Sequence, residues 1–235
     1  MEYNFIKVSK SNGVLRVTLN RPEKRNAFTP TTVSELAYTF NLANEDPQVK
    51  VVLLDAEGPV FCSGMDLKVF NDPTLDLENP HIPKQDVSLG QVFDQLLKPS
   101  IAVVQGAVIA GGFLMILGCT YVLAEKDCKF RLPELEIGLF PFQVLGSLMK
   151  VMPAKKALQL CLHTEYFQVD KALEFGIVDA VMDGGEELDE LLNRFSGFDT
   201  KILKAGVQAY KTLPHLSETE YYVFLKSCLE ALKSE

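Results

Sequence analysis

Three short stretches of this sequence hold residues that could stabilise a negative oxygen and move a proton. In the first, Val104–Met115, an apolar run is followed by Gly106 and then by Ala110-Gly111-Gly112, which open a helix. Glycines at a helix start let backbone N–H groups approach a ligand, and the helix dipole attracts negative charge there. This turn could hold a phosphate, or the oxygen of a thioester as it becomes an enolate. A tight turn without any ligand would have the same residues.

The second stretch, Phe61–Asp66, reads F-C-S-G-M-D. Gly64 frees the backbone here, so that the N–H of Met65 could point into a cleft together with the N–H of Gly111. Two such donors converging on one carbonyl oxygen form an oxyanion hole, and losing one donor typically lowers the rate about 10²–10³-fold. No base with a recognisable spacing accompanies the adjoining cysteine and serine, so we do not expect nucleophilic catalysis.

The third stretch carries a carboxylate, Glu134, among apolar neighbours between Leu132 and Phe140. Apolar surroundings would raise the pKa of this carboxyl and make it a base near neutral pH. The pair Pro133-Glu134 could instead open a helical turn, where the dipole favours an acidic residue. Glu136 is a rival carboxylate that would share one face of an extended chain, and the sequence does not choose between the two.

Alternating strand and helix patterns must position these stretches, and they predict an α/β class with a mostly parallel sheet and right-handed crossovers. We expect strands at 5–8, 14–19, 49–54, 101–104, 121–124, 129–132 and 177–181, and helices at 29–46, 87–97, 144–151, 154–162 and 169–175. Residues 71–90 are rich in Pro, Asn and Asp without a sustained period, which predicts a mobile surface segment and a candidate lid.

Composition narrows the function classes. The chain has 235 residues, of which 47% are hydrophobic, and can bury a large core. No apolar run approaches the ~20 residues that span a bilayer, and the start has no signal-peptide pattern. The cysteines are scattered and odd in number, which favours reduced thiols in a cytoplasmic protein over disulfides or a zinc site. They are Cys62, Cys119, Cys128, Cys161 and Cys228.

The net charge of −8 argues against nucleic acid and against an anionic membrane as partners. Positive charge is still concentrated locally at Arg21, Lys24 and Arg25, where it could meet an anionic small molecule, although a solvated turn would look the same. The histidines fall in no motif, and we expect none to be catalytic. They are His81, His163 and His215.

Five motifs, in order and in spacing over roughly residues 5–185, resemble the enoyl-CoA hydratase/isomerase (crotonase) family. They are N-R-P-E-K-R-N-A (20–27), F-C-S-G-M-D-L-K (61–68), the strand-turn-helix 98–115, P-E-L-E-I-G-L (133–139) and A-L-E-F-G-I-V-D-A-V (172–181). The resemblance implies a crotonase-like spiral of ββα units over residues 1–190 and a C-terminal helical region, 191–235, for packing and oligomerisation. It also implies homotrimers or hexamers and a coenzyme A thioester as substrate, with no metal and no separate cofactor.

The same motifs imply roles for individual residues. Met65 and Gly111 match the oxyanion-hole residues, and Met65, Asp66, Leu67 and Lys68 match the stretch that lines the acyl-CoA site. Lys24, Arg25 and Ala27 match the loop that meets the nucleotide end of coenzyme A, where basic residues suit the 3′-phosphate. Asp66 could equally cap the segment that follows it.

Two departures from the family pattern bear on the reaction. Family hydratases hold a water between two glutamates, whereas this chain has Leu114 at the first position and Glu134 at the second. The glycine-rich stretch after the second glutamate is replaced by the apolar residues 138–145. A single glutamate resembles the Δ3,Δ2-enoyl-CoA isomerases, in which one carboxylate moves a proton from C2 to C4. The family's C-terminal motif has no clear match after Tyr222.

The sequence therefore predicts an enzyme that stabilises a thioester enolate and isomerises an enoyl double bond through Glu134. One alternative is a hydratase-like enzyme, or a decarboxylase acting on acyl-CoA or on acyl-carrier-protein thioesters of the polyketide type. The other is a non-catalytic scaffold that retains the acyl-CoA fold.

Overall fold

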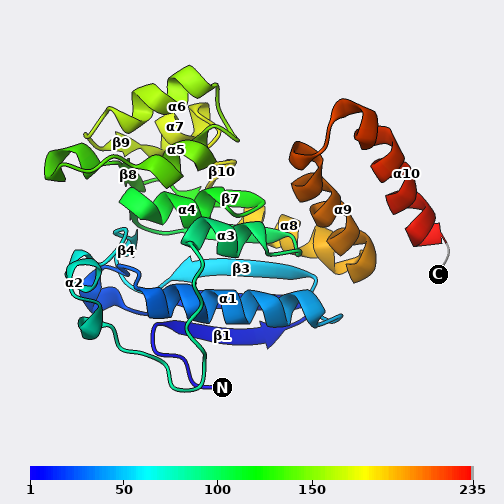
Figure 1. Cartoon of the computed structure of the whole chain (residues 1–235), viewed down its shortest axis with the longest axis horizontal. Helices are drawn as coiled ribbons and strands as arrows, with labels where there is room; N and C mark the ends of the chain where they lie inside the picture. The colour runs from blue at the N-terminus through cyan, green and yellow to red at the C-terminus, as the bar shows by residue number, and fades with distance from the viewer. Residues whose placement is uncertain (234–235) are drawn as a thin grey trace.

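The computed structural model describes residues 1–233, which form two sheets (Figure 1). In the larger sheet all neighbouring strands run parallel except the first pair, which is antiparallel. Its strands, in spatial order, are β1 (Ile6–Ser11), β2 (Val14–Leu19), β3 (Val51–Ala56), β5 (Ser100–Val104), β7 (Tyr121–Glu125) and β10 (Ala180–Met182). The smaller sheet consists of β4 (Val60–Cys62), β6 (Ala107–Ile109), β8 (Lys129–Arg131) and β9 (Phe167–Gln168).

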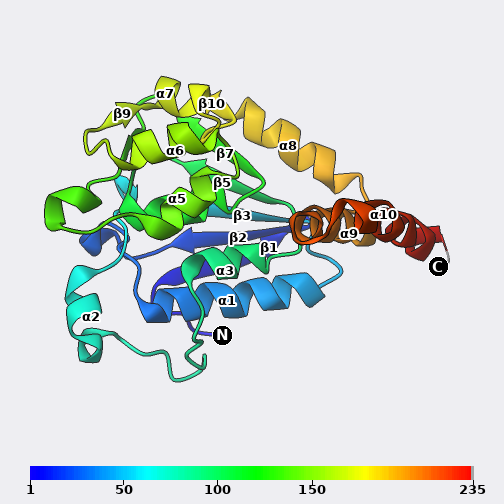
Figure 2. The same ribbon diagram turned by 45° about the horizontal axis from the view of Figure 1, so that its top comes forward.

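Helices cover both faces of the larger sheet, which explains why its central strands are mostly apolar. Side chains alternate along β3, so that Val52 and Leu54 enter the main core while Val51 and Leu53 face a second apolar cluster. Figure 2 shows α1 (Pro30–Glu45) and α3 (Leu89–Asp94) on one side of the sheet and α8 (Glu186–Ser196) on the other. The predicted α/β class is confirmed.

The other elements that precede α8 are short. They are η1 (Pro22–Lys24), α2 (Leu67–Asn71), η2 (Pro73–Leu75), η3 (Ala110–Gly112), α4 (Phe113–Leu117), η4 (Glu134–Ile137), α5 (Phe142–Leu148), α6 (Ala154–Cys161) and α7 (Val169–Glu174). The strand expected at 177–181 is confined to β10, and the helix expected at 87–97 to α3. Sequence patterns missed β4, β6 and β9, because two or three residues are too few to show a period.

Residues 72–88 form a strap along α1, within the segment 71–90 expected at the surface, and most of them are exposed. Hydrogen bonds anchor the strap to α1, and its movement as a lid stays a prediction. Asp76 accepts hydrogen bonds of 2.9 Å from both the backbone N–H and the hydroxyl of Thr31. Further along, the amide of Asn79 donates to Oε1 of Glu35 at 2.7 Å. Polar residues that suggest mobility in the sequence are here the anchors of the segment.

The chain ends in an arm formed by α9 (Thr200–Thr212), η5 (Leu213–His215) and α10 (Glu218–Lys233), which stands apart from the sheets in Figure 1. None of the residues in these three elements is buried. The boundary expected at residue 190 falls inside α8, whose Leu191 and Phe195 are buried against the sheet. Within residues 1–233, every helix is too short or too polar to cross a bilayer.

Candidate active site

Three neighbouring strands of the smaller sheet each lead into one of the residues expected to do chemistry. The parallel strands β4, β6 and β8 end at Cys62, Ile109 and Arg131. Met65, Gly111 and Glu134 follow these ends by two or three residues. Because the carboxyl ends of parallel strands meet at one edge of a sheet, the fold brings together groups that lie up to 69 positions apart in sequence.

The amide of Met65 is oriented by a single bridge to Phe28. The N–H of Phe28 donates to the carbonyl of Gly64 at 2.9 Å, and the N–H of Asp66 donates to the carbonyl of Phe28 at 2.9 Å. Since successive amides of an extended chain point in opposite directions, the N–H of Met65 points away from Phe28. Gly111 is the second residue of η3, so its N–H has no acceptor within that helix. Both donors are therefore available to a ligand.

Close packing brings these two backbone segments into contact and explains the glycines. A Cβ on Gly64 would lie 2.7 Å from Cβ of Ala110 and 3.3 Å from the nitrogen of Gly111. Gly64 also has a φ of +90°, and Ala110 has a φ of +53°, which is strained for a residue with a side chain. A Cβ on Gly111 would lie 2.9 Å from the ring of Phe28. Side chains at 64 or 111 would therefore separate the two donors.

The donors open into a cleft of about 970 Å³ that also contains Glu134. Its walls are mostly apolar. The lining residues are Phe28, Thr29, Pro30, Val33, Ser63, Met65, Leu67, Lys84, Gln85, Asp86, Val87, Ser88, Leu89, Ala110, Gly111, Leu114, Pro133, Glu134, Ile137, Leu139, Phe140, Pro141, Phe142, Gln143 and Val144. Of the residues expected to bind substrate, Met65, Leu67, Gly111 and Leu114 are therefore brought together with Glu134.

Glu134 and Glu136, which the sequence could not tell apart, occupy different surroundings. Oε2 of Glu134 is buried and has no hydrogen-bond partner among the described residues. Burial raises the pKa of this carboxyl. Glu136 is half exposed and accepts two hydrogen bonds of 2.7 Å from Arg131. A 3₁₀ helix has about three residues per turn, so the side chains of residues 134 and 136 point in different directions. In an extended chain they would have shared one face.

The wall beside Glu134 offers little to hold a water. Leu114, at the position of a possible second carboxylate, is 5% exposed and lines the cleft. Leu139 and Phe142, from the apolar stretch after Glu134, lie at the mouth and are largely exposed. An apolar chain could displace water from this wall. The lining holds two carboxylates, of which Asp86 is exposed and Glu134 has a buried oxygen.

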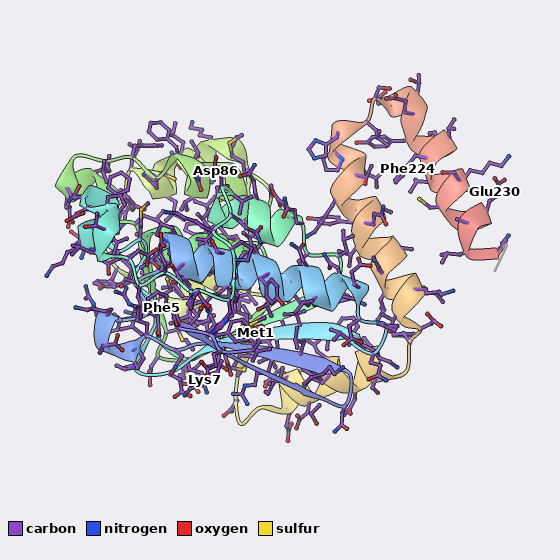
Figure 3. The ribbon with its side chains drawn as sticks, turned by 60° about the horizontal axis from the view of Figure 1, so that its bottom comes forward. Met1, Phe5, Lys7, Asp86, Phe224 and Glu230 are labelled. Atoms are coloured by element: carbon purple, nitrogen blue, oxygen red, sulfur yellow. The ribbon has the colours of Figure 1, made fainter. Side chains whose placement is uncertain are left out.

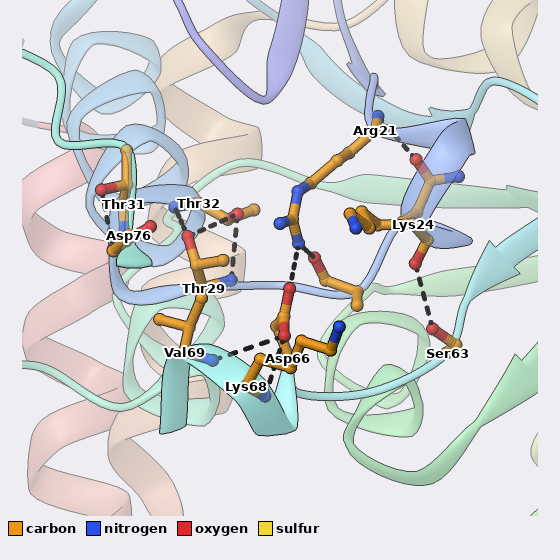
Figure 4. Close-up of polar contacts among 12 residues, drawn as sticks. Arg21, Lys24, Thr29, Thr31, Thr32, Ser63, Asp66, Lys68, Val69 and Asp76 are labelled. Atoms are coloured by element: carbon orange, nitrogen blue, oxygen red, sulfur yellow. Dashed lines mark hydrogen bonds and ion pairs between the residues drawn. The ribbon is translucent and has the colours of Figure 1, made fainter. Parts of the chain in front are cut away.

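The loop that holds Lys24 and Arg25 is not part of the cleft lining. Figure 4 shows the contact between Lys24 of this loop and Ser63. The side chains of Lys24 and Arg25 are exposed, and the carbonyl of Arg25 accepts a 3.0 Å hydrogen bond from the N–H of Ser63, which does line the cleft. Ala27 and Lys68 likewise lie outside the lining. These cations are placed where they could meet the outer part of a ligand that reaches the two amides.

Asp66 caps α2, which is the structural role that the sequence also allowed for it. Its Oδ1 accepts hydrogen bonds from the N–H groups of Lys68 and Val69 at the start of α2, and its Oδ2 binds Nη1 of Arg21 at 2.8 Å (Figure 4). The same nitrogen donates to the carbonyl of Ala27 at 2.9 Å. Arg21 is thus an internal clamp between two loops, and is not available to a ligand.

The cysteines and histidines give no competing chemistry. All five cysteines, which lie within residues 1–233, are free thiols. Cys62, the last residue of β4, is fully buried, and burial raises the pKa of its thiol to about 12. The histidines are exposed, and none belongs to the lining of the cleft within the described chain.

Sequence reasoning missed one wall of the cleft, which is built by residues 84–89 of the strap. It also missed the first turn of α1, where Thr29 and Pro30 line the cleft. The pair Thr29-Pro30 was recognisable as a helix start. No local pattern indicates that the strap returns to this helix, because the contact joins residues about 50 positions apart.

A family model described as enoyl-CoA hydratase/isomerase matches residues 9–225. The chain is 31% identical over 191 residues to an Arabidopsis thaliana protein named "Probable enoyl-CoA hydratase 1, peroxisomal", covering 79% of this chain and 69% of that protein. Among solved structures, an enoyl-CoA hydratase/isomerase from Marinobacter aquaeolei has a TM-score of 0.86 at 24% identity, with 98% of this chain and 92% of that chain covered. An enoyl-CoA hydratase from Mycobacterium tuberculosis H37Rv has a TM-score of 0.84 at 25% identity, with 98% and 90% covered.

Proposed function

Because the chain belongs to the enoyl-CoA hydratase/isomerase family, we propose that it binds an acyl-CoA thioester in the cleft and moves an enoyl double bond from Δ3 to Δ2. The family and the names of its relatives support a coenzyme A thioester as the substrate. The choice of isomerisation over hydration rests on the residues of this chain.

In the proposed reaction, the thioester oxygen accepts hydrogen bonds from the amides of Met65 and Gly111. The carboxylate of Glu134 removes a proton from C2, and the electron pair of that C–H bond moves onto the thioester oxygen to give a dienolate. The resulting carboxylic acid returns the proton to C4. The double bond is left between C2 and C3, and the carboxylate of Glu134 is regenerated.

The observation that carries the proposal is Glu134, the cleft-lining carboxylate with a buried oxygen, whereas Asp86, the other carboxylate of the lining, is exposed. Oε2 of Glu134 is buried without a partner in the described chain, while Leu114 occupies the place of a second acid. Proton transfer between two carbons of one substrate needs a single base that can reach both. Addition of water needs a further group that orients the water, and an apolar side chain such as that of Leu114 cannot supply it.

The remainder of the substrate would extend past the mouth of the cleft. We propose that Lys24, Arg25 and Lys68 bind phosphate groups of coenzyme A, and that Ala27, in the loop of Lys24 and Arg25, also contacts the coenzyme. Their exposed positions suit flexible, salt-sensitive contacts. The apolar walls suit a hydrocarbon acyl group, whether it is carried by coenzyme A or by an acyl carrier protein.

The test is to incubate a trans-3-enoyl-CoA with the protein in D₂O and to follow the products by NMR. The wild-type protein should form the trans-2-enoyl-CoA and exchange the C2 proton. Glu134→Gln should lower both rates at least about 100-fold while calorimetry shows unchanged thioester binding. Glu165→Gln, at an exposed glutamate outside the cleft lining, is the matched control.

Other products would assign other reactions. Undiminished isomerisation by Glu134→Gln would exclude the proposed mechanism. Formation of a 3-hydroxyacyl-CoA from a trans-2-enoyl-CoA would identify a hydratase. Release of carbon dioxide from a β-carboxyacyl thioester would identify a decarboxylase, and failure to bind any thioester would identify a scaffold.

A further inference from the structure

The turn that carries Glu134 has little to hold it in place. η4 is four residues long, and none of its residues is buried. Leu135 and Ile137, its apolar members, are 39% and 56% exposed. A short 3₁₀ turn has poor hydrogen-bond geometry and is weakly stable by itself. The direction of the Glu134 side chain therefore depends on whatever fixes this turn to the sheet.

The strongest side-chain contact of η4 is the one between Glu136 and Arg131. Nη2 of Arg131 lies 2.7 Å from both carboxylate oxygens of Glu136. Arg131 is itself held firmly, since it ends β8 and is paired with Ile109 of β6. Its Nε donates to the carbonyl of Thr164 at 2.7 Å, and its guanidinium lies 5.0 Å from the ring centre of Tyr166.

We propose that Arg131 is a positioning residue, which aims the carboxylate of Glu134 at the substrate by tying Glu136 to the sheet. Arg131 does not line the cleft and does not touch the reacting atoms. It connects the turn to β6, the strand that leads into Gly111, and so fixes the base relative to an oxyanion donor. This inference rests on the proposed function, in which Glu134 is the base.

A merely stabilising role predicts a different outcome. Ion pairs that are partly open to water contribute little to folding stability, and Glu136 is 47% exposed at its side chain. Misplacing a catalytic group by about 1 Å, by contrast, can lower a rate about 100-fold. Loss of the contact should therefore change kcat while the melting temperature and substrate binding stay almost the same.

The experiment compares Arg131→Met, Arg131→Lys, Glu136→Gln and the Arg131→Met/Glu136→Gln double variant, using C2-proton exchange on a trans-3-enoyl-CoA. Arg131→Met should lower kcat about 10- to 100-fold with KM within about twofold. Arg131→Lys retains the charge but cannot bind Glu136 and the carbonyl of Thr164 through two separate nitrogens, and should fall between Arg131→Met and the wild type. The double variant should be no slower than Arg131→Met, because both changes break one contact.

Lys171→Met is the matched control. It removes a 2.7 Å contact to Glu174 and a cation 4.6 Å from the ring of Phe175, outside the cleft around Glu134. Its kcat should equal that of the wild type.

Three results would overturn the inference. They are a wild-type kcat in folded Arg131→Met, a change confined to KM, and additive losses in the double variant. If Arg131→Met unfolds, a wild-type kcat in folded Glu136→Gln has the same meaning. These results leave the proposed function intact provided that Glu134→Gln is inactive, whereas an active Glu134→Gln contradicts the proposed function itself.

Discussion

Glu134 lies where its charge is poorly solvated, and this has a consequence for stability. Burial raises the pKa of the carboxyl. Between the ordinary pKa of a glutamate, about 4.3, and this raised value, the folded protein holds a proton that the unfolded chain has already released. Stability therefore falls as the pH rises through this range, and the deficit persists at higher pH.

The variant Glu134→Gln should reverse this loss, because glutamine does not ionise. At pH 7 we expect its melting temperature to exceed that of the wild type by about 1–3 °C. The difference should shrink below about pH 4, where the wild-type carboxyl is protonated in both states. Thermal unfolding followed at a series of pH values measures this directly. A difference that does not depend on pH would contradict the assignment of a raised pKa.

Individual residues also show which parts of the candidate site could be predicted from the sequence and which could not. The resemblance to the family motifs selected Met65, Gly111 and Glu134 as candidates. Residue types and spacing alone could not separate Glu134 from Glu136, since that choice depends on a 3₁₀ turn that replaces extended chain. Asp66 could be interpreted in two ways until its contact with Arg21 was known, 45 positions away.

At the scale of elements, the strap over 72–88 shapes the cleft through contacts at its two ends. Asp76 and Asn79 bind the first two turns of α1, and residues 84–89 form a wall of the cleft. Figure 3 shows Asp86 on this segment, where it passes over α1. Composition alone suggested mobility here, because a Pro- and Asn-rich segment gives no sign of its distant partners. Short strands such as β4 were missed for the same lack of local signal.

Removing one anchor should loosen that wall. Asn79→Ala deletes the hydrogen bond to Glu35, a fully buried carboxylate, and the one to the carbonyl of Glu2. We expect KM for an enoyl-CoA to rise several-fold with kcat within about twofold, and a destabilisation of about 1–3 kcal/mol. Steady-state kinetics and denaturant unfolding measure the two effects.

Thr74→Ala is the control for this experiment. It removes an exposed hydrogen bond to Asp72 that is local to the strap. An unchanged KM in Asn79→Ala, together with hydrogen exchange across residues 76–88 at the wild-type rate, would show that the wall does not need this anchor.

At the scale of the whole molecule, the C-terminal arm exposes several large apolar side chains, and contiguous exposed apolar surface is typical of interaction sites. Tyr222 and Val223 on α10 are 82% and 72% exposed. The arm is nevertheless tied to the core near the end of α9, where Lys211 donates to the carbonyls of Phe93, in α3, and Leu96, after α3, at 2.6 Å each. Burial lowers the pKa of that lysine to about 8. In Figure 3, Phe224 and Glu230 lie on α10, away from the sheets. We propose that further copies of this chain cover the arm.

The expected assembly is a homotrimer or hexamer, with three or six times the 26.1 kDa of one chain. The double variant Tyr222→Ser/Val223→Ser should shift the mass measured by light scattering toward the monomer, because exposed tyrosines often dominate such interfaces. Lys226→Ala, at an exposed ion pair on the same helix, should leave it unchanged. A wild-type protein that is monomeric at micromolar concentration would exclude the proposal.

Each reactive group of the cleft follows a different strand of one sheet, and this arrangement has an evolutionary consequence. The two amides proposed to bind the thioester oxygen lie after β4 and β6, whereas the carboxylate of Glu134 lies after β8. Substitutions in residues 132–145, the segment after β8, can therefore accumulate while the amides of Met65 and Gly111 stay in place. A lineage built on this scaffold can diversify its proton chemistry one loop at a time and keep the same kind of thioester throughout.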